Sequence, residues 1–130
     1  MTFVHAFPGV AEASAANVGG KAHSLIRMSR AKMPVPPGVV LTTAFFEPWF
    51  DAIRASSAWS AFLQSEREAW DTLCAKMKEL CGDFDLTEAQ HDALAIARDD
   101  LAKLGDEALF AVRSSSPEED LESASFAGGY

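Results

Sequence analysis

The stretch that decides the fold of this chain is Leu109-Phe-Ala-Val-Arg-Ser-Ser-Ser-Pro117, in which a short apolar run leads into an arginine and three serines. The apolar run 109–112 predicts a short buried strand. Arg113 then places a planar, permanently charged guanidinium where the backbone leaves the core. This layout suits the binding of an anion at the end of the strand.

The serines that follow the arginine predict a turn into a helix. Ser116 and Glu119 have the spacing of a capping box, and Pro117 would occupy the first helical position. The amides and hydroxyls of Ser114–Ser116 are therefore expected beside Arg113, in a corner that suits a phosphate. Arg113 could equally form an ion pair within the same turn, and anion binding would then compete with that pair. The acidic candidates are Glu118, Glu119 and Asp120.

A second motif, Val18-Gly-Gly-Lys-Ala-His-Ser-Leu25, lies near the start of the chain. Gly19 and Gly20 allow the backbone to approach a ligand closely. Apolar residues at helical spacing follow, so Lys21 is expected at a helix N-terminus, where the helix dipole favours anions over cations. The placement makes sense if Lys21 and the neighbouring amides share one bound anion. The spacer and second glycine of a Walker loop are absent, which excludes that motif.

The first half of the chain between the motifs predicts a helix, a strand and a further helix. The proline-rich stretch 34–37 ends the helix that carries Lys21, and residues 39–42 predict a strand. Thr43 can cap a following helix through Trp49, whose extent Pro48 leaves open.

The second half predicts two long helices. Apolar residues at three- and four-residue spacing predict one amphipathic helix from Ala58 to Cys81, which Gly82 closes. Thr87 and Gln90 form a capping box for a second helix that stops at Gly105. We expect the two helices to pack as a pair.

Charge is distributed unevenly along the chain. The net charge is −8, with +2 on residues 1–65 (five basic, three acidic) and −10 on residues 66–130 (six basic, sixteen acidic). An acidic balance argues against nucleic-acid binding, which needs a basic footprint to displace counterions. Most of the acidic residues are expected to solvate helix faces.

Length and composition together predict no more than one globular domain, located in the cytoplasm. Hydrophobic residues make up 48% and charged residues 23% of the 130 positions, which is ordinary for a packed domain. The longest apolar stretch, residues 39–46, is far too short to span a bilayer, and no targeting segment is visible. Cys74 and Cys81 lie about 10.5 Å apart along the predicted helix, which excludes a disulfide, so we expect reduced thiols that face the core.

Three stretches in order, 18–25, 34–45 and 112–128, resemble the N-terminal nucleotide-binding domain of the phosphoenolpyruvate synthase and pyruvate phosphate dikinase family. Rifampicin phosphotransferases share this domain, whose fold is an ATP-grasp. The resemblance implies an α/β (α+β) chain with short strands and several packed helices. It also implies that residues 1–130 are a single partial domain, the truncated N-terminal half of an ATP-grasp domain.

The resemblance also implies a nucleotide site. Lys21 and Arg113 match the family residues that contact the ATP phosphates, and the Ser125–Gly128 segment matches a glycine loop that folds over the triphosphate. The chain departs from the family at Lys32, where relatives commonly have glycine, and at Gly129, where glutamine is frequent. The remaining residues implied in cofactor binding are Gly19, Gly20, Ser114, Ser115, Ala127 and Gly128.

The function implied for the intact enzyme is phosphoryl transfer from ATP, through a phosphohistidine, to pyruvate or a related acceptor. The acidic residues that hold Mg²⁺ are expected in a second half of the domain, and phosphohistidine and phosphoenolpyruvate domains are expected partners. No catalytic residue and no metal ligand is expected within these 130 residues, because His5, His23 and His91 are scattered and acids in a first helical turn usually complement the dipole. The 130-residue chain alone is therefore expected to be inactive.

Two alternatives remain open. The chain could be a stand-alone, noncatalytic module that binds a phosphate, a nucleotide or a partner protein through the same corner. It could also self-associate through an apolar face that half a domain would leave uncovered.

Overall fold

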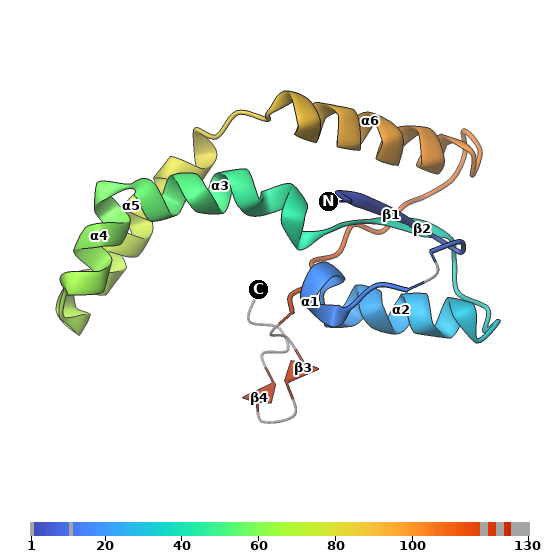
Figure 1. Ribbon diagram of the computed structural model, residues 1–130, viewed down its shortest axis with the longest axis horizontal. Coiled ribbons are helices and arrows are strands. Elements are labelled where there is room, and N and C mark those ends of the chain that lie inside the picture. Colours follow the sequence, from blue (N-terminus) through green and yellow to red (C-terminus); the bar gives the residue numbers. More distant parts are fainter. Residues whose placement is uncertain (1, 11, 118–119, 122–123, 126–130) are drawn as a thin grey trace. The chain divides into compact units, whose positions relative to one another are not determined.

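The computed structural model describes residues 2–10, 12–117, 120–121 and 124–125, and it divides into two compact units (Figure 1). The first unit comprises Met1–Phe45 and Gln90–Tyr130, and the second comprises Phe46–Ala89. Helices dominate both, and short strands occur in the first, so the predicted α+β class is confirmed. No helix in the described ranges is both long and apolar enough to cross a bilayer.

The first unit is built on a two-stranded antiparallel ribbon. Strand β1 (Val4–Phe7) pairs with β2 (Gly38–Leu41), so that Phe7 lies opposite Gly38. The Phe7 ring packs so closely that a Cβ on Gly38 would lie 2.8 Å from its Cζ atom. The structure confirms the strand predicted at 39–42, whereas the sequence patterns did not reveal β1.

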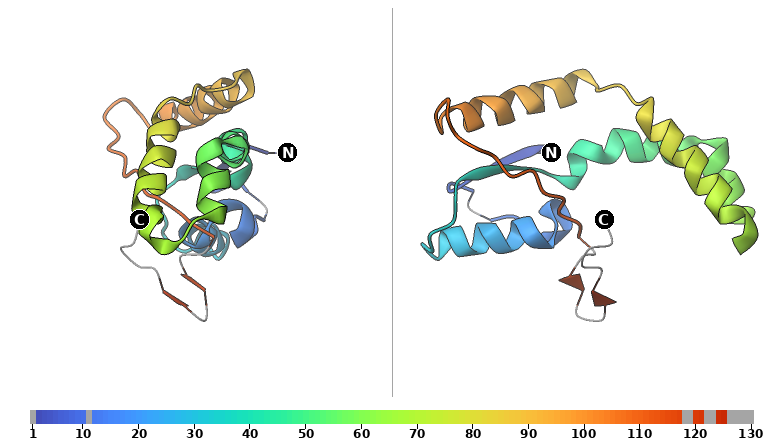
Figure 2. Two further views of the ribbon diagram at one scale, coloured as in Figure 1. Left: turned by 90° about the vertical axis from the view of Figure 1, so that its left-hand side faces the viewer. Right: turned by 180° about the vertical axis from the view of Figure 1, so that it is seen from behind.

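Two helices cover one side of this ribbon. They are α1 (Ala15–Val18) and α2 (Gly20–Arg30), and Figure 2 shows α2 running beneath the strands. Val18 and Ile26 are 2% and 1% exposed, and these side chains form the core together with Phe7. The helix predicted to carry Lys21 is therefore confirmed, and its apolar face anchors it to the ribbon. Ala13 and Ala22 complete the buried cluster.

Helix α6 (Glu88–Ala102) lies on the other side of the ribbon (Figures 1 and 2). Ala93 and Ala97 are its buried apolar residues. Gln90 is fully buried, and its Nε2 donates a hydrogen bond of 2.7 Å to the backbone oxygen of Phe45. Because a buried amide needs such a partner, this bond fixes Gln90 to Phe45 within the first unit. The second helix predicted from the sequence is confirmed.

The second unit is helical. After the boundary it contains most of α3 (Thr43–Ala55), then α4 (Ser57–Gln64), the short 3₁₀ helix η1 (Arg67–Ala69) and α5 (Trp70–Gly82). Helix α3 continues through Pro48, and Thr43, the predicted cap, is its first helical residue. The Thr43 hydroxyl donates to Ala16 O (3.3 Å) instead of capping the helix. Within the unit, α4 packs against α5.

The single helix predicted from Ala58 to Cys81 is wrong, because the chain breaks after Gln64. Ser65 has extended backbone angles (φ −91°, ψ 157°) and ends α4. The break lets the apolar stripe fold onto itself, so that the rings of Phe62 and Trp70 lie 5.7 Å apart. A continuous helix would hold these residues two turns apart and leave the stripe without a partner.

Cys74 and Cys81 are both free, as predicted, but only one is sheltered. Cys74 is partly buried and Cys81 is exposed. The prediction that both face the core is therefore wrong for Cys81. That prediction assumed one continuous helix with a single buried face. In the structure Cys81 lies in the last turn of the shorter helix α5, where it is exposed.

The strand predicted at 109–112 is also absent. These residues form no ladder, and Leu109 and Val112 are 99% and 98% exposed. A strand needs a neighbour for its backbone groups, and the described residues offer none at this position. The helix predicted from Pro117 fails where it can be checked, because the short strands β3 (Asp120–Leu121) and β4 (Ala124–Ser125) pair with each other. Residues 118–119 lie outside the described part.

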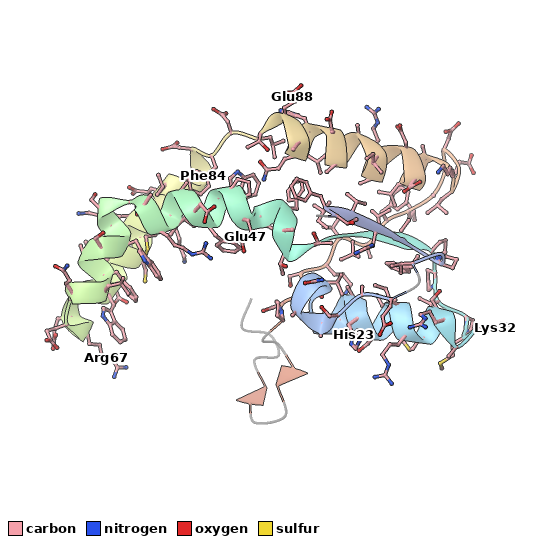
Figure 3. The ribbon with its side chains drawn as sticks, in the orientation of Figure 1. His23, Lys32, Glu47, Arg67, Phe84 and Glu88 are labelled. Atoms are coloured by element: carbon pink, nitrogen blue, oxygen red, sulfur yellow. The ribbon has the colours of Figure 1, made fainter. Side chains whose placement is uncertain are left out.

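Helix α2 ends in a Schellman motif that has lysine where glycine is preferred. The amide of Lys32 donates to Ser29 O (3.0 Å) and that of Met33 donates to Met28 O (3.1 Å). Lys32, which Figure 3 shows at the end of α2, has φ +58°, in the left-handed region that side chains with a Cβ disfavour.

We therefore expect Lys32→Gly to stabilise the chain by about 0.5–1 kcal/mol, because relief of the left-handed strain outweighs the extra entropy of glycine in the unfolded state. Urea unfolding followed by circular dichroism measures the change. Lys32→Ala, which removes the charge and keeps the Cβ, is the matched control and should show no such gain. Equal stabilisation by both substitutions would assign the effect to charge.

Candidate functional site

The two motifs singled out in the sequence meet at the side chain of Ser115. Its Oγ accepts a hydrogen bond of 3.1 Å from the amide of Ala22 and donates one of 2.8 Å to the backbone oxygen of Val18. The partners are 93 and 97 residues away along the chain. The segment Ser114–Ser116, called the serine segment below, is thus held against the turn between α1 and α2.

Backbone contacts tighten the same junction. The amide of Gly20 donates a hydrogen bond of 3.0 Å to the backbone oxygen of Ser116. A Cβ on Gly19 would lie only 2.3 Å from Ser115 Oγ and 2.4 Å from Ser115 O, and Gly19 has φ +80°. Glycine is therefore required at position 19 for two reasons: its φ is positive, and no Cβ would fit beside Ser115.

These contacts explain how α2 begins. The residue at its N-cap position is Gly19, which has no side chain to accept from the first amides of the helix. Ser115 supplies the missing hydroxyl from a distant part of the chain, bonding the amide of Ala22. The close approach that the glycines permit is thus made by Ser115 of the same chain.

This arrangement limits how the helix start can hold an anion. The amides of Gly20 and Ala22 already donate to Ser116 and Ser115. An anion at the junction would therefore depend mainly on the side chains of Lys21 and Arg113. The sequence predicted that these amides and Lys21 bind one anion together. In the structure, two of the amides donate hydrogen bonds to the serine segment instead.

The two predicted cations flank the junction. Lys21 is partly buried and lies between the two residues whose amides bond the serine segment. Arg113 is exposed and lies two residues before Ser115, a separation that spans at most about 7 Å of chain. Ser114, next to it, is also exposed. Ala127 and Gly128 lie outside the described residues.

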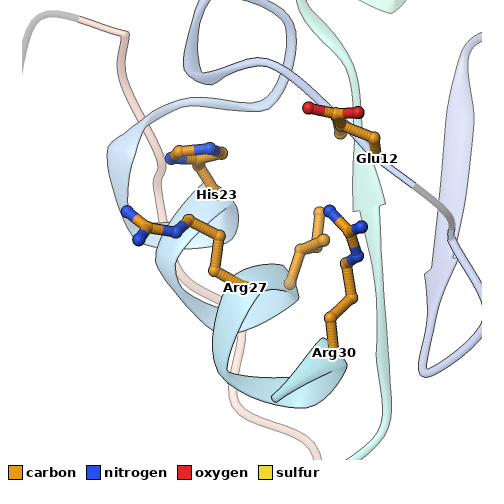
Figure 4. A pocket seen from close by; sticks show the side chains of 6 residues that line it. Glu12, His23, Arg27 and Arg30 are labelled. Carbon is orange, nitrogen blue, oxygen red and sulfur yellow. The ribbon is translucent and has the colours of Figure 1, made fainter.

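A separate pocket lies along α2 (Figure 4). Its volume is about 260 Å³, and His23, Arg27 and Arg30 project from α2 towards it while Glu12 lies on the segment before α1. Ala13 and Ile26 complete the lining, which includes neither Lys21 nor Arg113. Arg27 and Arg30 stand in the last turn of the helix, where cations complement the dipole. These arginines therefore serve as matched controls for the two predicted phosphate contacts.

The described residues contain no group of three His, Cys, Asp or Glu side chains close enough to hold a metal ion. No metal site is therefore assigned within them.

Comparison with known proteins identifies the family. Residues 15–130 match the model of the pyruvate phosphate dikinase AMP/ATP-binding domain. The chain belongs to this family. The match begins at the first residue of α1 and includes both motifs that meet at Ser115. It confirms the resemblance seen in the sequence.

Curated relatives are similar to this chain along most of its length. A rifampicin phosphotransferase from a Streptomyces species is 34% identical over 125 residues, covering 89% of this chain and 14% of the relative. A probable phosphoenolpyruvate synthase from Methanocaldococcus jannaschii is 33% identical, covering 85% and 10%. Another, from Staphylothermus marinus, is 30% identical, covering 85% and 14%.

The chain thus spans 10–14% of the length of these relatives. No solved structure matches the chain significantly.

Proposed function

We propose that this chain is the ATP-binding part of a phosphotransferase that moves phosphate from ATP, through a phosphohistidine, to pyruvate or a related acceptor. Lys21 and Arg113 contact the ATP phosphates. The observation that carries the proposal is the junction at Ser115, which holds together the two segments bearing these cations. The family match to an AMP/ATP-binding domain supports the choice of ligand.

The proposed role of Lys21 and Arg113 is to neutralise the negative charge of the phosphates. A triphosphate carries several negative charges, and phosphoryl transfer depends mainly on positioning and electrostatic stabilisation. Arg113 offers a planar fork of donors that matches phosphate oxygens, and Lys21 offers a compact ammonium. Gly19, Gly20, Ser114 and Ser115 form the frame around them in this proposal, and Ala127 and Gly128 belong to a loop that closes over the phosphates.

The proposal includes an ATP-grasp fold of which residues 1–130 form a partial domain, located in the cytoplasm. The rest of the domain and the phosphohistidine and phosphoenolpyruvate domains are its proposed partners. When bound with the nucleotide, Mg²⁺ would supply further neutralisation of the phosphates.

Titration of the ¹⁵N-labelled chain with ATP, followed by two-dimensional NMR, tests this function. We expect weak, saturable binding that shifts the amide signals of Lys21 and Arg113 more than those of α5. Adenosine should bind more weakly and inorganic triphosphate should compete, because the proposed contacts are to phosphates. Signals at both cations that do not respond to ATP would contradict the proposal.

The same chain should not turn over ATP. Release of ADP, measured by a coupled assay, is expected to stay at the background rate. Multiple turnovers by the 130-residue chain would refute this part of the proposal.

A further inference from the structure

We infer that Ser115 is a positioning residue that sets the place of Lys21 through hydrogen bonds to the backbone, rather than a residue that touches the nucleotide. The effect of Ser115 on ATP binding, which follows from this inference, rests on the proposed function. Its structural content concerns the start of α2 and stands without any ligand.

The hydrogen-bonding capacity of the hydroxyl is the first reason. A serine hydroxyl has one proton to donate, and Ser115 donates it to Val18 O at 2.8 Å. A phosphate oxygen is an acceptor, so a direct contact would require this internal bond to break. The oxygen meanwhile accepts from the amide of Ala22 at 3.1 Å. The side chain is therefore engaged within the chain in both roles.

The position of the two partners is the second reason. Val18 is the last residue of α1, and Ala22 belongs to the first turn of α2. Both side chains are buried, at 2% and 6% exposure, so their backbones are fixed in the core. Ser115 thus bridges two anchored helix ends across the turn that contains Lys21.

The absence of a local cap is the third reason. Gly19 occupies the N-cap position of α2 and contributes no side-chain hydrogen bond. Without Ser115, the amide of Ala22 would lose its acceptor, and the first turn of the helix, Lys21 included, would fray. The segment that carries Arg113 would lose the same attachment. The Ser115 hydroxyl therefore helps to maintain the separation of the two proposed phosphate contacts, together with the bond from the Gly20 amide to Ser116 O.

Amide hydrogen exchange of the ligand-free chain tests the structural content. In Ser115→Ala we expect exchange at Ala22 to accelerate at least about fivefold to tenfold, as the loss of an N-cap predicts. Amides in the middle of α6 should be unchanged. Ser24→Ala, an exposed serine on α2, is the matched control. Unchanged exchange at Ala22 in Ser115→Ala would overturn the inference.

ATP affinity then tests the consequence. Ser115→Ala should weaken ATP binding about fivefold to tenfold in the otherwise unchanged chain, and the loss should be clearly smaller in a Lys21→Ala background, where only the placement of Arg113 remains to be disturbed. An undiminished loss in that background would mean that Ser115 acts independently of Lys21 and would overturn the positioning role. Unchanged affinity in the first comparison would also overturn it.

Two features keep these results interpretable. If the unsubstituted chain fails to bind ATP, the proposed function fails, while hydrogen exchange at Ala22 still decides whether Ser115 sets the start of α2. If Ser115→Ala does not fold, Ser115→Cys keeps the shape of the side chain and replaces both hydrogen bonds with weak ones. Faster exchange at Ala22 in that variant supports the inference, and exchange equal to that of the unsubstituted chain overturns it.

Discussion

Replacing Gly19 with alanine is expected to destabilise the chain by about 3–5 kcal/mol, combining overpacking with backbone strain. The added Cβ would lie 2.3 Å from Ser115 Oγ, 2.4 Å from Ser115 O and 2.5 Å from Ser115 C. Two of these atoms belong to the backbone, so no rotamer change relieves the overlap. Gly19 also has φ +80°, which alanine rarely adopts. The segment after Arg113 would have to move away from α2.

Urea unfolding measured by circular dichroism gives the size of this effect. Gly82→Ala is the control, because a Cβ on Gly82 at the end of α5 would meet nothing within 4 Å. That control should be neutral or slightly stabilising, since alanine lowers the entropy of the unfolded chain. Equal stabilities for the two variants would show that the Gly19–Ser115 contact is not formed in solution.

Lys21→Ala and Arg113→Ala are each expected to weaken ATP binding about tenfold to a hundredfold, the cost of losing a hydrogen bond to a charged group. Isothermal titration calorimetry or NMR titration at fixed ionic strength measures the loss. The effect should shrink as salt rises, because the interaction is partly exposed to solvent. Circular dichroism of each variant confirms that it remains folded.

The matched control for these two variants is Arg27→Ala. It removes one positive charge from the same helix as Lys21, at a residue that lines the separate pocket of Figure 4. Its ATP affinity should stay within about twofold of the unsubstituted chain, since exposed charges at a distance are largely screened. An equal loss of ATP affinity in Arg27→Ala would show that Lys21 acts only through its general positive charge. It would contradict a specific contact between Lys21 and the phosphates.

Local patterns were sufficient to predict several elements. Helix α6 was anticipated from Thr87 and the apolar spacing that follows, and β2 and the start of α3 from the prolines before them and from Thr43. Signals of this kind operate within a few residues, so they remain valid wherever the rest of the chain lies. The three ordered motifs were likewise enough to indicate the family that the sequence comparison confirms.

Elements that depend on a distant partner were not predictable in this way. The apolar spacing from Trp59 to Trp70 stays compatible with one helix, and only the packing of α4 against α5 shows why the chain breaks at Ser65. The apolar residues 109–112 have strand composition, yet no described strand pairs with them. Composition does not reveal whether a partner for the backbone is present.

The sequence alone determined which residues carry charge and flexibility in this protein: a lysine after two glycines, an arginine before three serines, and the family to which that combination belongs. Only the tertiary structure decided that the two motifs touch, and that Ser115 completes the helix start that Gly19 leaves uncapped. The physical reason is that a hydrogen bond across 93 residues depends on the packing of the core between them, which no local pattern contains.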